Sequence, residues 1–143
     1  NTSINWHTTN RIWQDGWPKG VSLKESIWIE NLPPMLLSTP EQAIIELLLS
    51  VPDTISFEHA DQIMQGLTQL SPKKLSLLLN DCANIKVKRL FFWFSDRYSY
   101  AWRKKLDVEK FDLGSGKRSI VKGGKLDKQY LITVPDKFIG GIV

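Results

Sequence analysis

The stretch KVKRLFFWFSDRYSYAWR, from Lys86 to Arg103, constrains the fold more than any other part of the sequence. On a helical wheel, its apolar and aromatic side chains gather on one face, which holds Val87, Leu90, Phe91, Phe94, Tyr98 and Ala101. The other face is charged and carries, at regular intervals, Arg89, Asp96 and Arg103. The pattern predicts an amphipathic helix whose aromatic face joins a hydrophobic core. We expect a bend or an end between Ser99 and Leu106, because Lys105 would otherwise fall on the apolar face.

Capping signals predict three shorter helices upstream of this stretch. A hydroxyl side chain that can accept a hydrogen bond from the first turn precedes each of them, at Thr39, Ser56 and Ser71. Proline, which suits the first helical position, follows two of these residues, at Pro40 and Pro72. The helices are expected over Pro40 to about Ser50, Phe57 to Leu67 and Pro72 to about Ala83.

Strand signals lie on both sides of the helices. Residues 2–30 alternate between apolar and polar types around two turn signals, which favours a small antiparallel sheet. Further strands are expected over Met35–Leu37, Arg118–Val121 and Tyr130–Val134. The last two would be joined by the paired glycines of Lys122-Gly123-Gly124-Lys125. The expected fold class is α+β, with a small antiparallel sheet from N- and C-terminal strands packed against four or five helices.

At 143 residues, the chain is expected to form one domain over 1–143, since this length can bury a core without disulfides or metal. It contains no apolar run near the length of a membrane span, so we expect a soluble protein. The single cysteine, Cys82, fits a reducing cytoplasm and a role in packing. Because the sequence opens at Asn1 on a strand-like pattern, we expect that an N-terminal portion of a longer parent is missing.

Charge is distributed unevenly along the chain. Residues 1–55 carry three Lys or Arg and six Asp or Glu, a net charge of −3, whereas residues 56–143 carry sixteen and nine, a net charge of +7. Between Lys86 and Lys128 there are thirteen basic and five acidic residues, a net charge of +8. A positive field of this kind attracts polyanions or an acidic protein without specifying which.

The sequence offers little that could support catalysis. The glycine-rich segment DLGSGKRSIVKGGKLDKQYLITVP lacks the P-loop pattern, because Phe111 and Ser119 stand where its first glycine would precede Lys117 and Lys125. Gly114-Ser115-Gly116-Lys117 therefore indicates either a glycine turn entering a strand or an anion-binding nest of backbone N–H groups. Two histidines and one cysteine form no metal-ligand spacing, and SFEHAD fits acids favoured in a first helical turn. We expect no catalytic residue, no metal and no cofactor.

Binding of nucleic acid or of another partner is the function that the residues themselves favour. Basic side chains alternate with aromatic ones in the second half of the chain. The candidate binding residues are Lys86, Lys88, Arg89, Phe92, Trp93, Arg97, Arg103, Lys104, Lys117 and Arg118. A charged outer face over an aromatic core would produce the same pattern, so that alternative stays open. Phe92 favours an interaction surface, because it falls on the polar side of the wheel, unless the terminal strands cover it.

Four segments of the sequence resemble the C-terminal domain of AbiEi-type antitoxins, which belong to type IV toxin-antitoxin and phage abortive-infection systems. They are LLSTPEQAIIELL, SFEHADQIMQGL, KVKRLFFWFSDRYSYAWRKKLD and DLGSGKRSIVKGGKLDKQYLITVP, and the resemblance spans about Trp13 to Pro135. The positions that match the recurrent motif are His59, Asp61, Lys88, Arg89, Trp102, Leu106, Asp107, Asp112, Gly114, Gly116, Lys117, Arg118, Tyr130 and Pro135. The resemblance transfers no catalytic role to any of them.

The resemblance implies a bacterial autorepressor whose N-terminal winged helix-turn-helix, absent from this sequence, binds promoter DNA. The present domain would act as a non-catalytic antitoxin against a nucleotidyltransferase-like toxin and would support DNA binding. Direct contact with the toxin and formation of a homodimer remain open. Two alternatives are a protein-docking module, suggested by Phe92 and Trp93 beside the basic residues, and a phosphoryl-transfer or nuclease enzyme acting on the toxin or on RNA.

Overall fold

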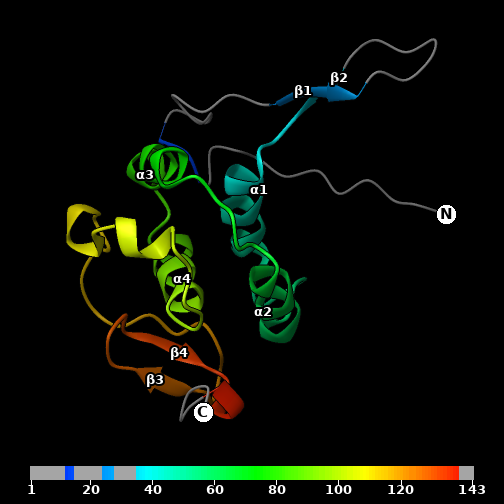
Figure 1. Cartoon of the computed structure of the whole chain (residues 1–143). Coiled ribbons are helices and arrows are strands. Elements are labelled where there is room, and N and C mark those ends of the chain that lie inside the picture. The colour runs from blue at the N-terminus through cyan, green and yellow to red at the C-terminus, as the bar shows by residue number, and fades with distance from the viewer. Residues whose placement is uncertain (1–11, 15–23, 28–34, 139–143) are drawn as a thin grey trace, which may run out of the picture.

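The computed structural model of the chain describes residues 12–14, 24–27 and 35–138, and four α-helices form its centre (Figure 1). They are α1 (Pro40–Leu47), α2 (Phe57–Gln65), α3 (Pro72–Asp81) and α4 (Ile85–Ser95). The strands are β1 (Lys24–Ile27), β2 (Met35–Leu37), β3 (Lys125–Asp127) and β4 (Ile132–Val134). The α+β class is confirmed. Among the described residues, the strands form two separate antiparallel pairs, β1 with β2 and β3 with β4, so these N- and C-terminal strands share no sheet.

The three upstream helices begin where their caps predict. Thr39 Oγ1 accepts a hydrogen bond from the Gln42 amide at 3.3 Å, and a short 3-10 turn continues α1 to Ser50. The Ser56 and Ser71 hydroxyls accept equivalent bonds at 3.0 and 3.2 Å from amides three residues later. Each bond satisfies a backbone donor that the helix itself leaves unpaired. These helices are therefore specified locally.

Helix α4 is shorter than its wheel predicts, and it is buried on every side. It ends at Ser95 rather than between Ser99 and Leu106, and every residue from Val87 to Ser95 is buried. In Figure 1 it lies between the α1–α2 side of the molecule and the β3–β4 hairpin. The expectation of a solvent-facing charged side was wrong here, because a second layer covers the side that the wheel leaves polar.

That second layer comes from the chain after α4, which consists of residues 96–124, named here the return path, and the C-terminal hairpin of β3 and β4. Phe92, on the polar side of the wheel, packs against Phe111 and Tyr130, with ring centroids 5.6 and 6.3 Å away. Earlier in the same return path, Trp102 stacks on Tyr100 at 4.4 Å. Trp102 Nε1 donates to the Leu67 carbonyl at 2.9 Å, and the Tyr100 hydroxyl donates to the Met64 carbonyl. The aromatic core thus extends across both sides of α4.

The C-terminal hairpin differs from the prediction. Lys125 pairs with Val134 and Asp127 with Ile132, so β3 begins where the expected glycine turn should have ended. Residues 118–121 form no regular strand; they hold to β4 by one parallel bridge, Arg118 to Ile132, and by amides that donate to Thr133 Oγ1. A Cβ on Gly124 would lie 2.4 Å from the Val134 carbonyl oxygen. This close approach explains why a glycine stands there.

Near the N-terminus, most of the sheet expected over residues 2–30 falls outside the described residues. In the described part, Trp13 is buried and forms an isolated antiparallel bridge with Cys82, and its Nε1 donates to Glu46 at 3.0 Å. Cys82 is fully buried, as its expected packing role requires. The expected strand Met35–Leu37 is present as β2. Among the described helices, none is long and apolar enough to cross a membrane.

Candidate functional site

The basic residues of α4 lie inside the fold. Arg89 is 2% exposed, and it donates from Nε to the Leu113 carbonyl at 2.7 Å and from Nη1 to the Gly116 carbonyl at 2.7 Å. A longer bond of 3.4 Å reaches the Leu131 carbonyl. Burial, followed by repulsion from Arg118, lowers the pKa of the Arg89 guanidinium. Arg89 therefore ties the glycine-rich segment to the helix, and it presents no free cation to a partner.

Lys88, Phe92 and Trp93 are buried as well, so a partner cannot reach them on the folded surface. Lys86 is partly covered, and its Nζ donates to the Leu49 carbonyl at 3.0 Å. These residues were candidates because their types suit binding. The fold uses them for packing and for bonds to backbone carbonyls, and the protein-docking alternative loses the two aromatic residues that suggested it.

Arg97 and Arg103 are engaged in contacts that join distant segments. Arg97 forms a two-pronged ion pair with Asp61 of α2, at 2.8 and 3.2 Å. Its guanidinium lies 4.5 Å from the ring centroid of Phe138, which is a cation–π contact. Both partners hold the arginine in place, so its charge is largely neutralised within the fold.

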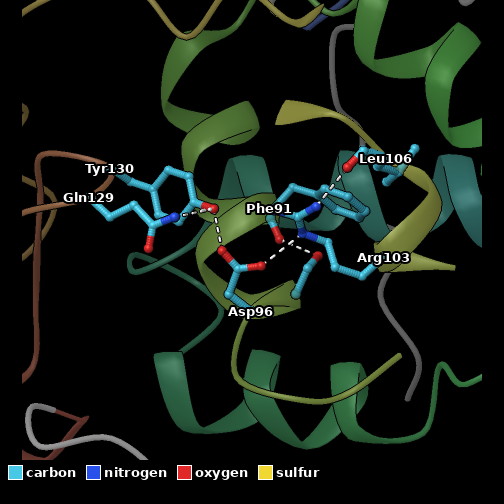
Figure 2. Close-up of polar contacts among 7 residues, drawn as sticks. Phe91, Asp96, Arg103, Leu106, Gln129 and Tyr130 are labelled. Atoms are coloured by element: carbon cyan, nitrogen blue, oxygen red, sulfur yellow. Dashed lines mark hydrogen bonds and ion pairs between the residues drawn. The ribbon is translucent and has the colours of Figure 1, made fainter. Parts of the chain in front are cut away.

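Figure 2 shows a polar group at the C-terminal end of α4. Arg103 Nε donates to Asp96 Oδ1 at 2.8 Å, Arg103 Nη1 donates to the Leu106 carbonyl at 2.8 Å, and the Tyr130 hydroxyl donates to Asp96 Oδ2. Burial and the bond to Asp96 raise the pKa of the Tyr130 phenol above its ordinary value. The group links α4, its return path and the C-terminal hairpin. Its members have structural partners, and none is left free to meet a ligand.

Eight exposed cations lie further along the chain, in short 3-10 turns, on loops and on the C-terminal hairpin. We name this set the cationic edge, and its members are Lys104, Lys105, Lys110, Lys117, Arg118, Lys122, Lys125 and Lys128. None of them forms an ion pair within the part of the chain that the structure describes. From residue 113 to residue 128 there are five such cations and a single acid, Asp127, a net charge of +4. Asp127 Oδ2 is itself occupied by the Tyr130 amide at 2.7 Å.

Three of the ten predicted binding residues, Lys104, Lys117 and Arg118, belong to the cationic edge. The other five members were missed, although the charge count for residues 86–128 included them. For Lys122, Lys125 and Lys128, the signal that could have found them is their position in a glycine-rich segment, which must stay near the surface, whereas Lys105 and Lys110 precede that segment. The prediction favoured the helix because aromatic residues accompany its charges there.

A shallow depression of about 410 Å³ opens beside this region. Phe111 and Tyr130 line its apolar part, while Glu109, Asp112 and Gln129 line its polar part. Two carboxylates at a depression disfavour a phosphate or another anion there. Leu113 and Gly114 also line the depression, whereas residues 115–118 do not, so the depression and the cationic edge differ in the sign of ligand that they suit.

Of the groups considered for catalysis, the Glu58 carboxylate is held in an ion pair. Glu58, at the start of α2, pairs with Lys137, and this contact lowers the pKa of its carboxyl. The His59 amide donates to the cap of its own helix, and Lys117 lies in the glycine-rich segment held by Arg89. Burial raises the pKa of the Cys82 thiol, which stays protonated. Within residues 12–14, 24–27 and 35–138, no three His, Cys, Asp or Glu side chains gather to hold a metal ion.

Nearly the whole chain is similar to a known family. Residues 2–135 match the family described as transcriptional regulator, AbiEi antitoxin, Type IV TA system. The matched range includes all four helices, the glycine-rich segment and the cationic edge. No curated protein and no solved structure matches the chain.

Proposed function

We propose that this chain, which belongs to the AbiEi antitoxin family of type IV toxin-antitoxin regulators, is a non-catalytic regulatory domain. In this proposal it counteracts a nucleotidyltransferase-like toxin and adds sequence-independent phosphate contacts to the promoter binding of its parent protein. The observation that carries the DNA part is the cationic edge, a set of exposed basic side chains without acidic partners among the described residues.

Lysines on loops suit contacts to phosphates better than the recognition of DNA bases. Phosphate contacts fix the orientation of a protein on a duplex and carry no sequence information, whereas base recognition needs side chains held rigidly in a groove. Helix α4, which carries four consecutive aromatic residues, is buried and cannot enter a groove. The domain is therefore proposed to strengthen binding that another part of the parent protein directs.

The test is the salt dependence of DNA binding by the full chain. If the cationic edge contacts phosphates, the logarithm of affinity should fall with the logarithm of salt concentration, by about 0.9 for each phosphate contacted. An unrelated duplex should give the same slope as promoter DNA. No binding at low salt, or binding that ignores salt, would remove DNA contact from the function.

Matched variants place the contact on the surface. Replacing Lys122 and Lys125 together by alanine should reduce the slope, because these two side chains supply part of the counter-charge. The control replaces Lys73 and Lys74, exposed lysines near the start of α3, which lie outside the cationic edge. Equal losses from both sets would show that only net charge matters and would contradict a defined contact surface.

The antitoxin part of the proposal is tested separately. Cells that express the cognate toxin should survive when the parent protein carries this domain and should stop growing when the domain is deleted. Calorimetry of the purified domain with the toxin then asks whether protection uses direct contact. Protection by a parent protein without this domain would contradict the assignment.

A further inference from the structure

We infer that the turn from Leu113 to Arg118 is a binding site for a phosphate group, with the buried Arg89 guanidinium beneath it. This inference rests on the proposed function for the source of the phosphate, which is either a nucleic-acid backbone or a nucleotide. It assigns a defined site to one part of the cationic edge. The remaining cations of the edge would act only through their charge.

A buried positive charge, the Arg89 guanidinium, lies below the turn. Arg89 is buried, and two of its three acceptors, the carbonyls of Leu113 and Gly116, belong to the turn itself. No carboxylate lies within ion-pair distance of it among the described residues. Backbone carbonyls satisfy the N–H groups of a guanidinium, but they leave its net charge in place. A buried charge without a counter-ion is costly, and an anion on the turn would compensate it.

The peptide between Gly116 and Lys117 directs its N–H away from Arg89. In a planar trans peptide, the carbonyl and the next N–H point to opposite sides. Because the Gly116 carbonyl points inward to Arg89, the Lys117 N–H points away from it. Gly114 and Gly116 have φ of +68° and +79°, the left-handed conformation in which neighbouring N–H groups can converge on an anion.

Some backbone donors of the turn are occupied, and three consecutive ones are free within the described residues. The Gly114 amide is occupied by Asp112 Oδ1 at 2.8 Å, and the Arg118 amide by the Leu131 carbonyl at 2.8 Å. The amides of Ser115, Gly116 and Lys117 have no acceptor within the described residues, and all three residues are exposed. Consecutive unpaired N–H groups are the donors that protein phosphate sites use.

Further positive charge lies on the exposed side of the turn. The side chains of Lys117 and Arg118 are exposed and have no ion-pair partner in the described chain. Repulsion between Arg118 and Arg89 contributes to the lowered pKa of Arg89. A phosphate held at the turn would lie near both guanidinium groups and would relieve that repulsion. A doubly charged tetrahedral anion with several acceptor oxygens matches this number of donors.

The experiment is a titration of the ¹⁵N-labelled full chain, followed by amide chemical shifts. The probes are inorganic phosphate, a nucleoside triphosphate and a short duplex DNA. We expect saturable shifts of the Ser115, Gly116 and Lys117 amides with each probe. Shifts spread evenly over all basic residues, or no shift in the turn with any probe, would overturn the inference. Saturation by the nucleotide alone would identify a nucleotide rather than a nucleic-acid backbone as the source.

Matched variants separate a site from general attraction. Changing Lys117→Ala together with Arg118→Ala should weaken phosphate and nucleotide binding about tenfold, because two charge-assisted contacts are lost. Changing Lys122→Ala together with Lys128→Ala removes the same charge from the same edge and should weaken it less than about twofold. Circular dichroism checks that both variants stay folded. Equal weakening by the two variants would overturn the site.

The results also separate this inference from the proposed function. If DNA binds with the expected salt slope while the turn amides do not shift, the phosphate site fails and the cationic edge stands. If phosphate and nucleotide shift the turn while DNA does not bind, the site stands and the DNA contact fails.

Discussion

Helix α4 carries three basic residues and the glycine-rich segment 113–128 carries five, and the two regions use them in opposite ways. In α4, Lys88 and Arg89 are buried, and Arg89 donates to carbonyls of the segment. In the segment, Lys117, Arg118 and Lys122 are exposed. A helix satisfies its own backbone and can be surrounded completely, whereas a loop has unpaired peptide groups and needs water or side-chain donors. The buried Arg89 of the helix therefore supports the loop, and the loop keeps its own basic side chains exposed.

The largest loss of stability is expected at Phe92, where the return path covers α4. Replacing Phe92 by alanine should lower the free energy of unfolding by about 3–5 kcal/mol, because a fully buried ring is lost and leaves a cavity. Denaturant unfolding measures the change. Leu77→Ala is the control: Leu77 is 41% exposed, and its loss should cost much less. A loss below about 1 kcal/mol at Phe92 would mean that the return path does not pack as described.

Arg89→Met tests whether the helix supports the segment. We expect a loss of about 2 kcal/mol in unfolding free energy, because carbonyls of the turn lose their donors while methionine keeps much of the side-chain volume. Proteolysis should become faster within residues 113–118. Arg118→Met, which removes an exposed charge next to the turn, should leave both quantities nearly unchanged. Equal effects of the two substitutions would contradict the distinction between buried and exposed cations.

Tyr130→Phe tests the hydrogen bond that joins the hairpin to the end of α4. Loss of the bond to Asp96 should lower the unfolding free energy by about 1–2 kcal/mol at neutral pH. Because the pKa of Tyr130 is raised in the fold, the unfolded chain ionises first as pH rises above the ordinary value of 10.0. The wild-type advantage should therefore shrink above that pH. Unfolding curves of both proteins across this range measure it, and an advantage that grows with pH would contradict the buried, protonated phenol.

The smallest change in unfolding free energy is expected for the exposed lysines of the glycine-rich segment. Lys122→Ala with Lys128→Ala should change the unfolding free energy by no more than about 0.5 kcal/mol, since neither side chain is buried or paired in the described chain. Thermal unfolding is a sufficient measurement. A substantial loss of stability would show that these lysines are structural, like Arg89, and would remove them from the cationic edge.

Much of the helical architecture was predictable because its signals are local. Thr39, Ser56 and Ser71 each bond to an amide three residues away, so the information that starts a helix lies within one turn. The order of the quoted segments indicated the AbiEi antitoxin family, and the match over residues 2–135 confirms it. The exposed position of Lys117 and Arg118 also agrees with their place in a glycine-rich loop.

The predictions that failed required partners far along the chain. Burial of Phe92 depends on Tyr130, and the end of α4 at Ser95 depends on a return path that covers its polar side. The pairing of β3 with β4, instead of the expected pairing across Gly123-Gly124, depends on a tight turn before Ile132 in which Leu131 has φ of +57°. No pattern in the sequence marks a leucine for that left-handed conformation.

The sequence by itself determined where three helices start, which family the chain belongs to, and that its second half is cationic. Only the tertiary structure decided which cations are available, because Arg89 meets its carbonyl acceptors 24, 27 and 42 residues further along the chain. A basic side chain is buried where folding brings unpaired peptide carbonyls beside it to accept its N–H groups, and it stays exposed where folding does not. That pairing is a property of the assembled layers, and a helical wheel of one segment does not contain it.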